Sequence, residues 1–81
     1  MKPRVTLYTR AGCCLCDEAK QVIAEARLYT EFDYEEFDID ADPELRRLYN
    51  DEIPVVAING MKKFQYRMDL KQFLNRLASS K

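Results

Sequence analysis

Three cysteines, Cys13, Cys14 and Cys16, lie within four positions of this 81-residue chain, and the sequence contains no others. Histidine is absent, so any acid–base chemistry falls to thiols, carboxylates, lysine or water. No secretory signal is visible, and clustered cysteines in such a chain argue against a framework of structural disulfides. The cluster therefore indicates redox or metal chemistry in a reducing compartment, which we expect to be the cytoplasm.

The spacing of the three thiols decides which of them can pair. Successive helical residues are about 100° apart around the axis, so Cys13 and Cys16 return to the same side of a helix. Cys14 and Cys16 point away from each other. The Cα atoms of Cys13 and Cys14 are only about 3.8 Å apart, which is shorter than the usual disulfide span. The natural dithiol is therefore Cys13 with Cys16, a C-x-x-C pair.

Position along the expected helix assigns the roles of the thiols. Cys13 lies at the helix start, where unpaired N–H groups and the dipole favour a thiolate, and Arg10 adds positive charge nearby. Cys16 lies one turn inside, where burial raises the pKa of a thiol. We assign Cys13 as the nucleophile and Cys16 as the resolving thiol that attacks the mixed disulfide. Cys14 is interpreted as a tolerated surface residue, with a third redox or metal thiol as the alternative.

The overall composition is that of one globular domain over residues 1–81. The chain is 47% hydrophobic and 33% charged with a net charge of −1, which predicts no binding to nucleic acid or anionic membranes. The longest apolar run, "IPVVAI", is too short to cross a membrane. Residues 31–52 hold ten acidic and two basic side chains, whereas residues 61–81 hold six basic and one acidic. This segregation fits either two solvated faces or a polarised docking surface for a protein partner.

The elements that must position the thiols alternate between strands and helices. Apolar periodicity divides the chain into these elements. Helix starts are indicated by Asp42, Pro43 and Asp69, and a hairpin turn is indicated by Asn59-Gly60. We expect strands at 4–9, 34–40, 54–58 and 61–67, and helices at about 14–29, at 43–49 and from 70 onward. The order is β-α-β-α-β-β-α. It predicts an α/β fold with a four-stranded mixed sheet flanked by helices, the first two strands being parallel.

A strand that runs into "RAGCCLCDEAK", with "EIPVVAING" about forty residues later, resembles the thioredoxin fold. Within that fold it is most similar to small glutaredoxin-like proteins, whose motif reads G-C-x-L-C-D-E-A. The resemblance covers the chain from Val5 to about Leu77. It implies disulfide reductase activity on protein or small-molecule disulfides, without a bound cofactor or metal. It also implies that the electron donor is either glutathione, acting as a co-substrate, or a thioredoxin reductase.

The resemblance further implies a substrate site. The family holds the proline of "IPV" in cis, which would turn the backbone of Ile53 outward beside Cys13 to pair with a peptide or glutathione. The alternative for Pro54 is a plain edge proline that starts a strand. Arg10 matches the family's usual basic residue before the motif. Asp69 alone could supply the acidic contact to glutathione.

Two departures from the better-known glutaredoxins bear on the electron donor. Their C-P-Y-C motif is replaced here by Cys-Cys-Leu-Cys, and the Gly-Gly that precedes their last helix is replaced by "YRMDL". The missing glycines should remove the backbone shape that glutathione-binding relatives use, so we expect weak glutathione binding.

Other functions could use the same thiols. A soft-metal carrier also places C-x-x-C after its first strand, but usually has methionine where Ala11 stands and has no need of "IPV". An iron–sulfur protein would share a cluster across a dimer, although nothing else in the chain supplies a fourth ligand for a closed site. An inert adaptor on the same scaffold is the third alternative. We expect a monomeric oxidoreductase.

Overall fold

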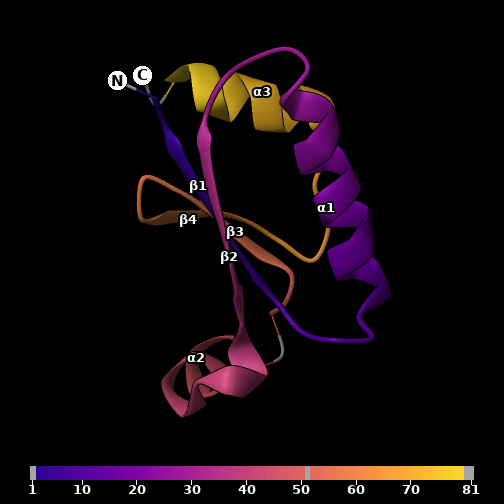
Figure 1. Ribbon diagram of the computed structural model, residues 1–81, viewed down its shortest axis with the longest axis vertical. Helices are drawn as coiled ribbons and strands as arrows, with labels where there is room; N and C mark the ends of the chain where they lie inside the picture. Colours follow the sequence, from indigo (N-terminus) through magenta and orange to yellow (C-terminus); the bar gives the residue numbers. More distant parts are fainter. Residues whose placement is uncertain (1, 51, 80–81) are drawn as a thin grey trace.

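The computed structural model describes residues 2–50 and 52–79 and shows the predicted order of elements (Figure 1). The elements are β1 (Arg4–Thr9), α1 (Cys14–Ala26), β2 (Asp33–Asp38), the 3-10 turn η1 (Ile39–Ala41), α2 (Pro43–Tyr49), β3 (Val55–Ile58), β4 (Met61–Gln65) and α3 (Leu70–Ser79). The α/β fold with a four-stranded mixed sheet is therefore confirmed. No helix in the described part of the chain is long and apolar enough to cross a membrane.

The strand order of the sheet is β2-β1-β3-β4, so β1 is one of the two inner strands. β1 and β2 run parallel because α1 forms the crossover between them, whereas the other two pairs are antiparallel. In the antiparallel part, Tyr8 of β1 lies opposite Val55, and Val55 lies opposite Gln65 of β4. The carboxyl end of β1, from which the cysteine motif continues, is thus flanked on one side by the start of β3.

One face of the sheet carries the main hydrophobic core under α1 and α3 (Figure 1). Strand alternation directs Val5 and Leu7 to this face, and both side chains are fully buried. Phe73 of α3 is also fully buried and contacts the rings of Phe32 and Phe64 edge-on, at centroid distances of 5.8 and 6.2 Å. This core fixes the two helices against the sheet and so sets the position at which α1 begins.

The opposite face has a smaller aromatic cluster that attaches α2. The ring of Tyr8 stacks on Phe37 of β2 at 5.8 Å and on Tyr49 of α2 at 4.6 Å. No residue of α2 is fully buried. Figure 1 shows α2 at the end of the molecule opposite α3. We infer that α2 depends on this stacking and on η1 for its position.

The local signals read from the sequence are confirmed at the element ends. Asn59 and Gly60 have φ angles of 54° and 85°, as a type I′ hairpin turn requires. Asp42 caps α2 by accepting a 2.9 Å hydrogen bond from a backbone N–H of its first turn. Asp69 accepts a 3.3 Å hydrogen bond from the N–H of Gln72 and caps α3 in the same way.

Three elements end earlier than the periodicity predicts, one begins a residue sooner, and β3 begins at Val55, one residue later than expected. α1 ends at Ala26, because the apolar side chains that follow do not pack against the core; Leu28 is 82% exposed. β2 begins one residue before the predicted start and ends at Asp38, whose carboxylate accepts the N–H of Asp40 at 2.9 Å and starts η1. β4 ends before Tyr66, whose backbone turns out of the strand conformation.

Candidate active site

The cysteine motif lies where β1 passes through a tight loop into α1. Gly12 has a φ of 77°, a left-handed conformation that residues with a Cβ rarely adopt, and this turns the chain toward the helix. Cys13 follows in an extended conformation as the N-cap of α1, and its Sγ accepts a 3.2 Å hydrogen bond from the N–H of Cys16. The predicted placement of Cys13 at the helix start is confirmed, and its sulfur faces the unpaired N–H groups of the first turn.

Cys13, Cys14 and Cys16 have three different environments. Cys14 is exposed, Cys13 is half-buried and Cys16 is 1% exposed. Burial raises the pKa of the Cys16 thiol, and its contact with the Cys13 thiol raises it further. The chain therefore holds Cys16 as a neutral thiol beside a more accessible sulfur. The expected solvent exposure of Cys14 is confirmed.

Thr9, the last residue of β1, is a neighbour of Cys16 that the sequence reasoning missed. Alternation after Val5 and Leu7 directs its side chain to the face that α1 covers, and it is only 5% exposed. Its Oγ1 has no hydrogen-bond partner of good geometry in the described residues. The hydroxyl nevertheless lowers the pKa of Cys16, because it favours the thiolate. The signal in the sequence was a hydroxyl residue on the core-facing side of an otherwise apolar strand.

Arg10 is held by a carboxylate from a distant part of the chain. Its Nε and Nη2 donate to the two oxygens of Asp40 at 3.0 and 2.9 Å, and Nη2 also donates to Asn50 at 2.8 Å. Hydrogen bonding to Arg10 lowers the pKa of Asp40, and the reciprocal bond raises the pKa of Arg10. The Cys13 sulfur also acts on the Arg10 charge, so the two groups are close enough to interact. Asp40 was not distinguished in the sequence from its many acidic neighbours.

The predicted substrate backbone at Ile53 and Pro54 lies beside the end of β1. The Ile53-Pro54 peptide bond is cis, as expected. Because Tyr8 pairs with Val55, Pro54 lies one position further along, across from Thr9. The structure thus brings this segment next to the loop that carries Cys13. Contact of Ile53 with a substrate stays a prediction.

The segment before α3 contains a residue in the left-handed region although both glycines are missing. Tyr66 has a φ of 66°. The weak glutathione binding expected from the missing glycines stays a prediction. The N–H of Tyr66 donates to the carbonyl of Pro54 at 3.0 Å. Within the described residues, Asp69 shares no hydrogen bond or ion pair with Arg10 or Cys13, and its carboxylate caps α3. Glutathione contact by Asp69 stays a prediction.

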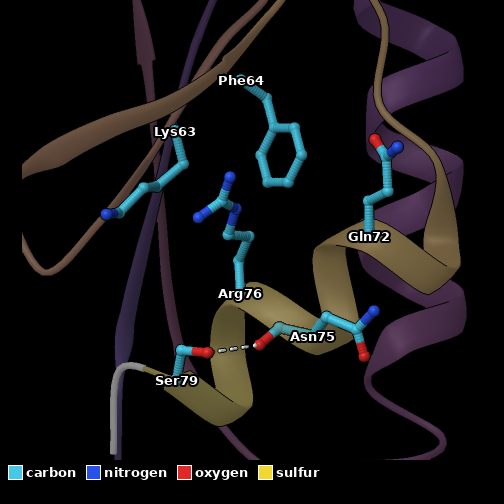
Figure 2. A pocket seen from close by; sticks show the side chains of 6 residues that line it. All are labelled: Lys63, Phe64, Gln72, Asn75, Arg76 and Ser79. Carbon is cyan, nitrogen blue, oxygen red and sulfur yellow. Dashed lines mark hydrogen bonds between the residues drawn. The ribbon is translucent and has the colours of Figure 1, made fainter.

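A cavity of about 460 Å³ between β4 and α3 lies outside this site (Figure 2). Figure 2 shows the Arg76 side chain below the Phe64 ring and the hydrogen bond of 3.1 Å from Ser79 to the carbonyl of Asn75. None of the site residues predicted from the sequence lines this cavity. Over residues 2–50 and 52–79, no group of three cysteine or carboxylate side chains converges as a metal site would require.

The chain matches one known family over nearly its whole length. The model of the glutaredoxin-like domain family (DUF836) matches residues 4–78 of the chain. The chain belongs to the glutaredoxin-like family. The matched range spans the three cysteines and Ile53-Pro54, and the resemblance to the glutaredoxin-like family inferred from the sequence is confirmed.

The chain is also similar to individual proteins and solved structures. The uncharacterized protein Rv0508 of Mycobacterium tuberculosis is 33% identical over 84 residues, which cover 98% of this chain and 87% of that protein. Protein Ne2328 from Nitrosomonas europaea has a similar structure, with a TM-score of 0.82 and 28% identity over 95% of this chain and 93% of that one. A mutant thioredoxin from Halobacterium salinarum, with a TM-score of 0.74 and 14% identity over 98% and 74% of the chains, shares the fold.

Proposed function

We propose that the protein is a thiol–disulfide oxidoreductase that reduces protein or small-molecule disulfides with Cys13 as nucleophile and Cys16 as resolving thiol. The single observation that carries this proposal is the arrangement of the two sulfurs at the start of α1. The Cys13 sulfur accepts the N–H of Cys16 at 3.2 Å, whereas the Cys16 thiol is buried beneath it. Membership of the glutaredoxin-like family supports the same redox chemistry.

The proposed reaction exchanges one disulfide for another. The Cys13 thiolate attacks one sulfur of the substrate disulfide, the substrate S–S bond breaks, and the other substrate sulfur leaves as a thiolate that takes up a proton. Cys16 then loses its proton and attacks the Cys13 sulfur, which releases the second substrate thiol. The substrate gains two electrons and the protein is oxidised to a Cys13–Cys16 disulfide. Glutathione or a thioredoxin reductase would return the two electrons.

Charge and hydrogen bonding around the pair support this division of roles. Cys13 lies at the start of α1, and its sulfur interacts with the positive charge of Arg10. Burial keeps Cys16 protonated, so it does not compete for the substrate disulfide. Thr9 lies on the buried side of Cys16, where a hydroxyl stabilises the thiolate as it forms. Substrate backbone would pair with Ile53 beside these sulfurs.

The roles are tested with two single variants and insulin as the disulfide substrate. We expect Cys13→Ser to abolish disulfide reduction, because no nucleophile remains at the helix start. Cys16→Ser should accumulate a mixed disulfide with substrate, visible by mass spectrometry under non-reducing conditions, because the resolving step is lost. Equal alkylation rates of Cys13 and Cys16 at neutral pH would contradict the assignment.

The electron donor is tested by comparing two reducing systems. Oxidised protein is mixed with glutathione, glutathione reductase and NADPH, or with thioredoxin reductase and NADPH. Because we expect weak glutathione binding, the second system should reduce the protein faster. A glutathione dissociation constant in the micromolar range, measured by titration calorimetry, would contradict that expectation without affecting the proposed disulfide chemistry.

A further inference from the structure

Tyr66, between β4 and α3, has a backbone conformation that tyrosine rarely adopts. Its φ of 66° lies in the left-handed region that glycine occupies freely and that, among other residues, asparagine tolerates best. Asn59 is the other non-glycine residue in this region within the described residues, and it belongs to the tolerant class. A bulky residue at such an angle carries strain that the surrounding structure must maintain.

Main-chain hydrogen bonds hold Tyr66 in this conformation. Its N–H donates to the carbonyl of Pro54 at 3.0 Å, and the next N–H, of Arg67, donates to the carbonyl of Gln65 at 2.8 Å. Both bonds use backbone atoms only. The same backbone would therefore accept glycine without strain, and the presence of a tyrosine ring needs a separate explanation.

Packing in the core does not provide that explanation. Phe64 and Met68, two residues away on either side, both pack against the main core, whereas Tyr66 does not belong to that cluster and is 45% exposed. Packing in the main core therefore does not account for the tyrosine at this position. The conformation presents an aromatic ring at the surface.

The sheet register places the backbone of Tyr66 in the row that contains the end of β1. Tyr8, Val55 and Gln65 form one row across β1, β3 and β4, so the next row contains Thr9, Pro54 and Tyr66. Neighbouring strands are about 4.8 Å apart, which puts the Tyr66 backbone about 10 Å from the end of β1. That strand end leads through a three-residue loop to Cys13.

A groove continues from the cysteine motif along the segment that follows Tyr66. It has a volume of about 290 Å³, and its walls are α1 and residues 67–68. On the α1 side it begins at Leu15, which lies between Cys14 and Cys16, and on the other side it includes Arg67 and Met68. The groove thus begins at a residue of the cysteine motif and includes the two residues that follow Tyr66, which suits it to an extended chain joined to the Cys13 sulfur.

We propose that Tyr66 is a specificity-determining contact for polypeptide disulfides, an inference that rests on the disulfide reductase function proposed above. The ring packs against the residue beside the substrate cysteine, and the groove between α1 and residues 67–68 receives the extended segment beyond it. A small-molecule disulfide is too short to occupy the groove and gains less from the ring. Tyr66 adds binding contact and leaves the exchange reaction at Cys13 unchanged.

The test compares wild-type protein with Tyr66→Gly and with Tyr29→Ala, which removes another exposed tyrosine ring beyond the far end of α1. Pre-reduced protein is mixed with insulin or with 2-hydroxyethyl disulfide, and the second-order rate constant is measured for each. In Tyr66→Gly we expect the ratio of the insulin to the small-disulfide rate constant to fall roughly three- to tenfold, the size of one aromatic contact. Its thermal unfolding midpoint should not fall, because glycine relieves the backbone strain.

The outcomes separate this inference from the proposed function. Tyr29→Ala should keep the wild-type ratio. If both disulfides are reduced and Tyr66→Gly keeps the wild-type ratio, the Tyr66 contact is refuted and disulfide reduction stands. A lower unfolding midpoint for Tyr66→Gly would assign the ring a structural role and refute the contact as well. If wild-type protein reduces neither disulfide, the reductase function fails and the contact fails with it.

Discussion

At the scale of single residues, the two thiols of one C-x-x-C pair differ because their environments differ. Cys13 caps a helix and is half-buried, whereas Cys16 is enclosed between α1 and the sheet. A sulfur that must react first needs access and a stabilised thiolate, and a sulfur that must react second needs to be kept protonated until then. The fold places an accessible sulfur and a buried one within one helical turn, as the proposed order of reaction requires.

The raised pKa of Cys16 predicts a pH dependence of stability. Burial raises the folded-state pKa above the unfolded value, so the folded state binds more protons in alkaline solution. The corresponding stability is fully present below about pH 8, near the ordinary thiol pKa, and is lost as the pH rises through the folded-state pKa. Urea unfolding of reduced protein from pH 7 to 10 should show a steeper loss for wild type than for Cys16→Ala. Parallel curves would contradict the prediction.

The Thr9 hydroxyl predicts an effect on the resolving step. Thr9→Val keeps the shape of the side chain but removes the group that lowers the pKa of Cys16. We expect decay of the mixed disulfide at pH 7 to slow roughly two- to tenfold, the range for one hydrogen bond, measured by quench and mass spectrometry. Thr6→Val is the matched control, because the Thr6 hydroxyl bonds Glu35 at 3.0 Å. Equal slowing in both variants would show a general packing effect.

At the scale of elements, the loop between β1 and α1 is fastened to the η1 turn by Arg10 and Asp40. The two side chains form a pair of parallel hydrogen bonds at 3.0 and 2.9 Å. The same carboxylate also lies 3.5 Å from Arg46 Nε. Asp40 therefore fixes the loop and, at the same time, offsets part of the positive charge near Cys13.

Asp40→Asn tests this balance of charge. The amide keeps one hydrogen-bond acceptor for Arg10 but removes the negative charge, so more of the positive charge acts on Cys13. We expect the rate of Cys13 alkylation by iodoacetamide at pH 7 and low salt to rise about two- to threefold, and the difference to shrink in 0.5 M salt. Asp42→Asn, which keeps a good N-cap for α2, is the control. A lower rate in Asp40→Asn would mean that loop geometry outweighs charge.

One buried aromatic residue of α3, Phe73, should contribute strongly to the free energy of unfolding. Phe73 is fully buried and contacts Phe32 and Phe64 edge-on. Phe73→Ala should lower the free energy of unfolding by about 3–5 kcal/mol, because it leaves a cavity in the core. Phe73→Leu retains most of the volume and should lose less. Urea denaturation measures both, and a loss under 1 kcal/mol for the alanine variant would contradict this view of the core.

At the scale of the whole molecule, the acidic and basic stretches of the sequence form different elements. The acidic stretch forms β2, η1 and α2, and the basic stretch forms β4 and α3. Figure 1 shows α2 and α3 at opposite ends of the molecule. Cys14 is exposed beside the dithiol, at the start of α1, where a second molecule can approach it.

Exposure of Cys14 predicts an oxidative dimer. We expect the reduced protein to be monomeric and wild-type protein treated with hydrogen peroxide to form a disulfide-linked dimer on a non-reducing gel. Cys14→Ser should resist dimerisation and keep most of the disulfide reductase activity, because Cys14 cannot bridge Cys13 or Cys16 without strain. Loss of activity in Cys14→Ser together with activity in Cys13→Ser would reverse the assignment of the nucleophile.

The sequence by itself determined the order of the elements, the C-x-x-C pair and the position of Cys13 at a helix start. These features depend on short-range patterns: apolar periodicity, helix caps, the Asn59-Gly60 turn and the spacing of the cysteines. The structure changed element ends and added the short turn η1 where the sequence predicted the end of a strand, because local capping at Asp38 competes with periodicity there.

Only the tertiary structure decided which distant groups surround the thiols. Asp40 reaches Arg10 across 30 positions of the chain, and Thr9 lies beneath Cys16 because α1 crosses that face of the sheet. The left-handed backbone of Tyr66 depends on its hydrogen bond to Pro54, which exists only after β3 and β4 have paired. Such contacts leave no local pattern, because they arise from the register of the strands and the packing of helices against them.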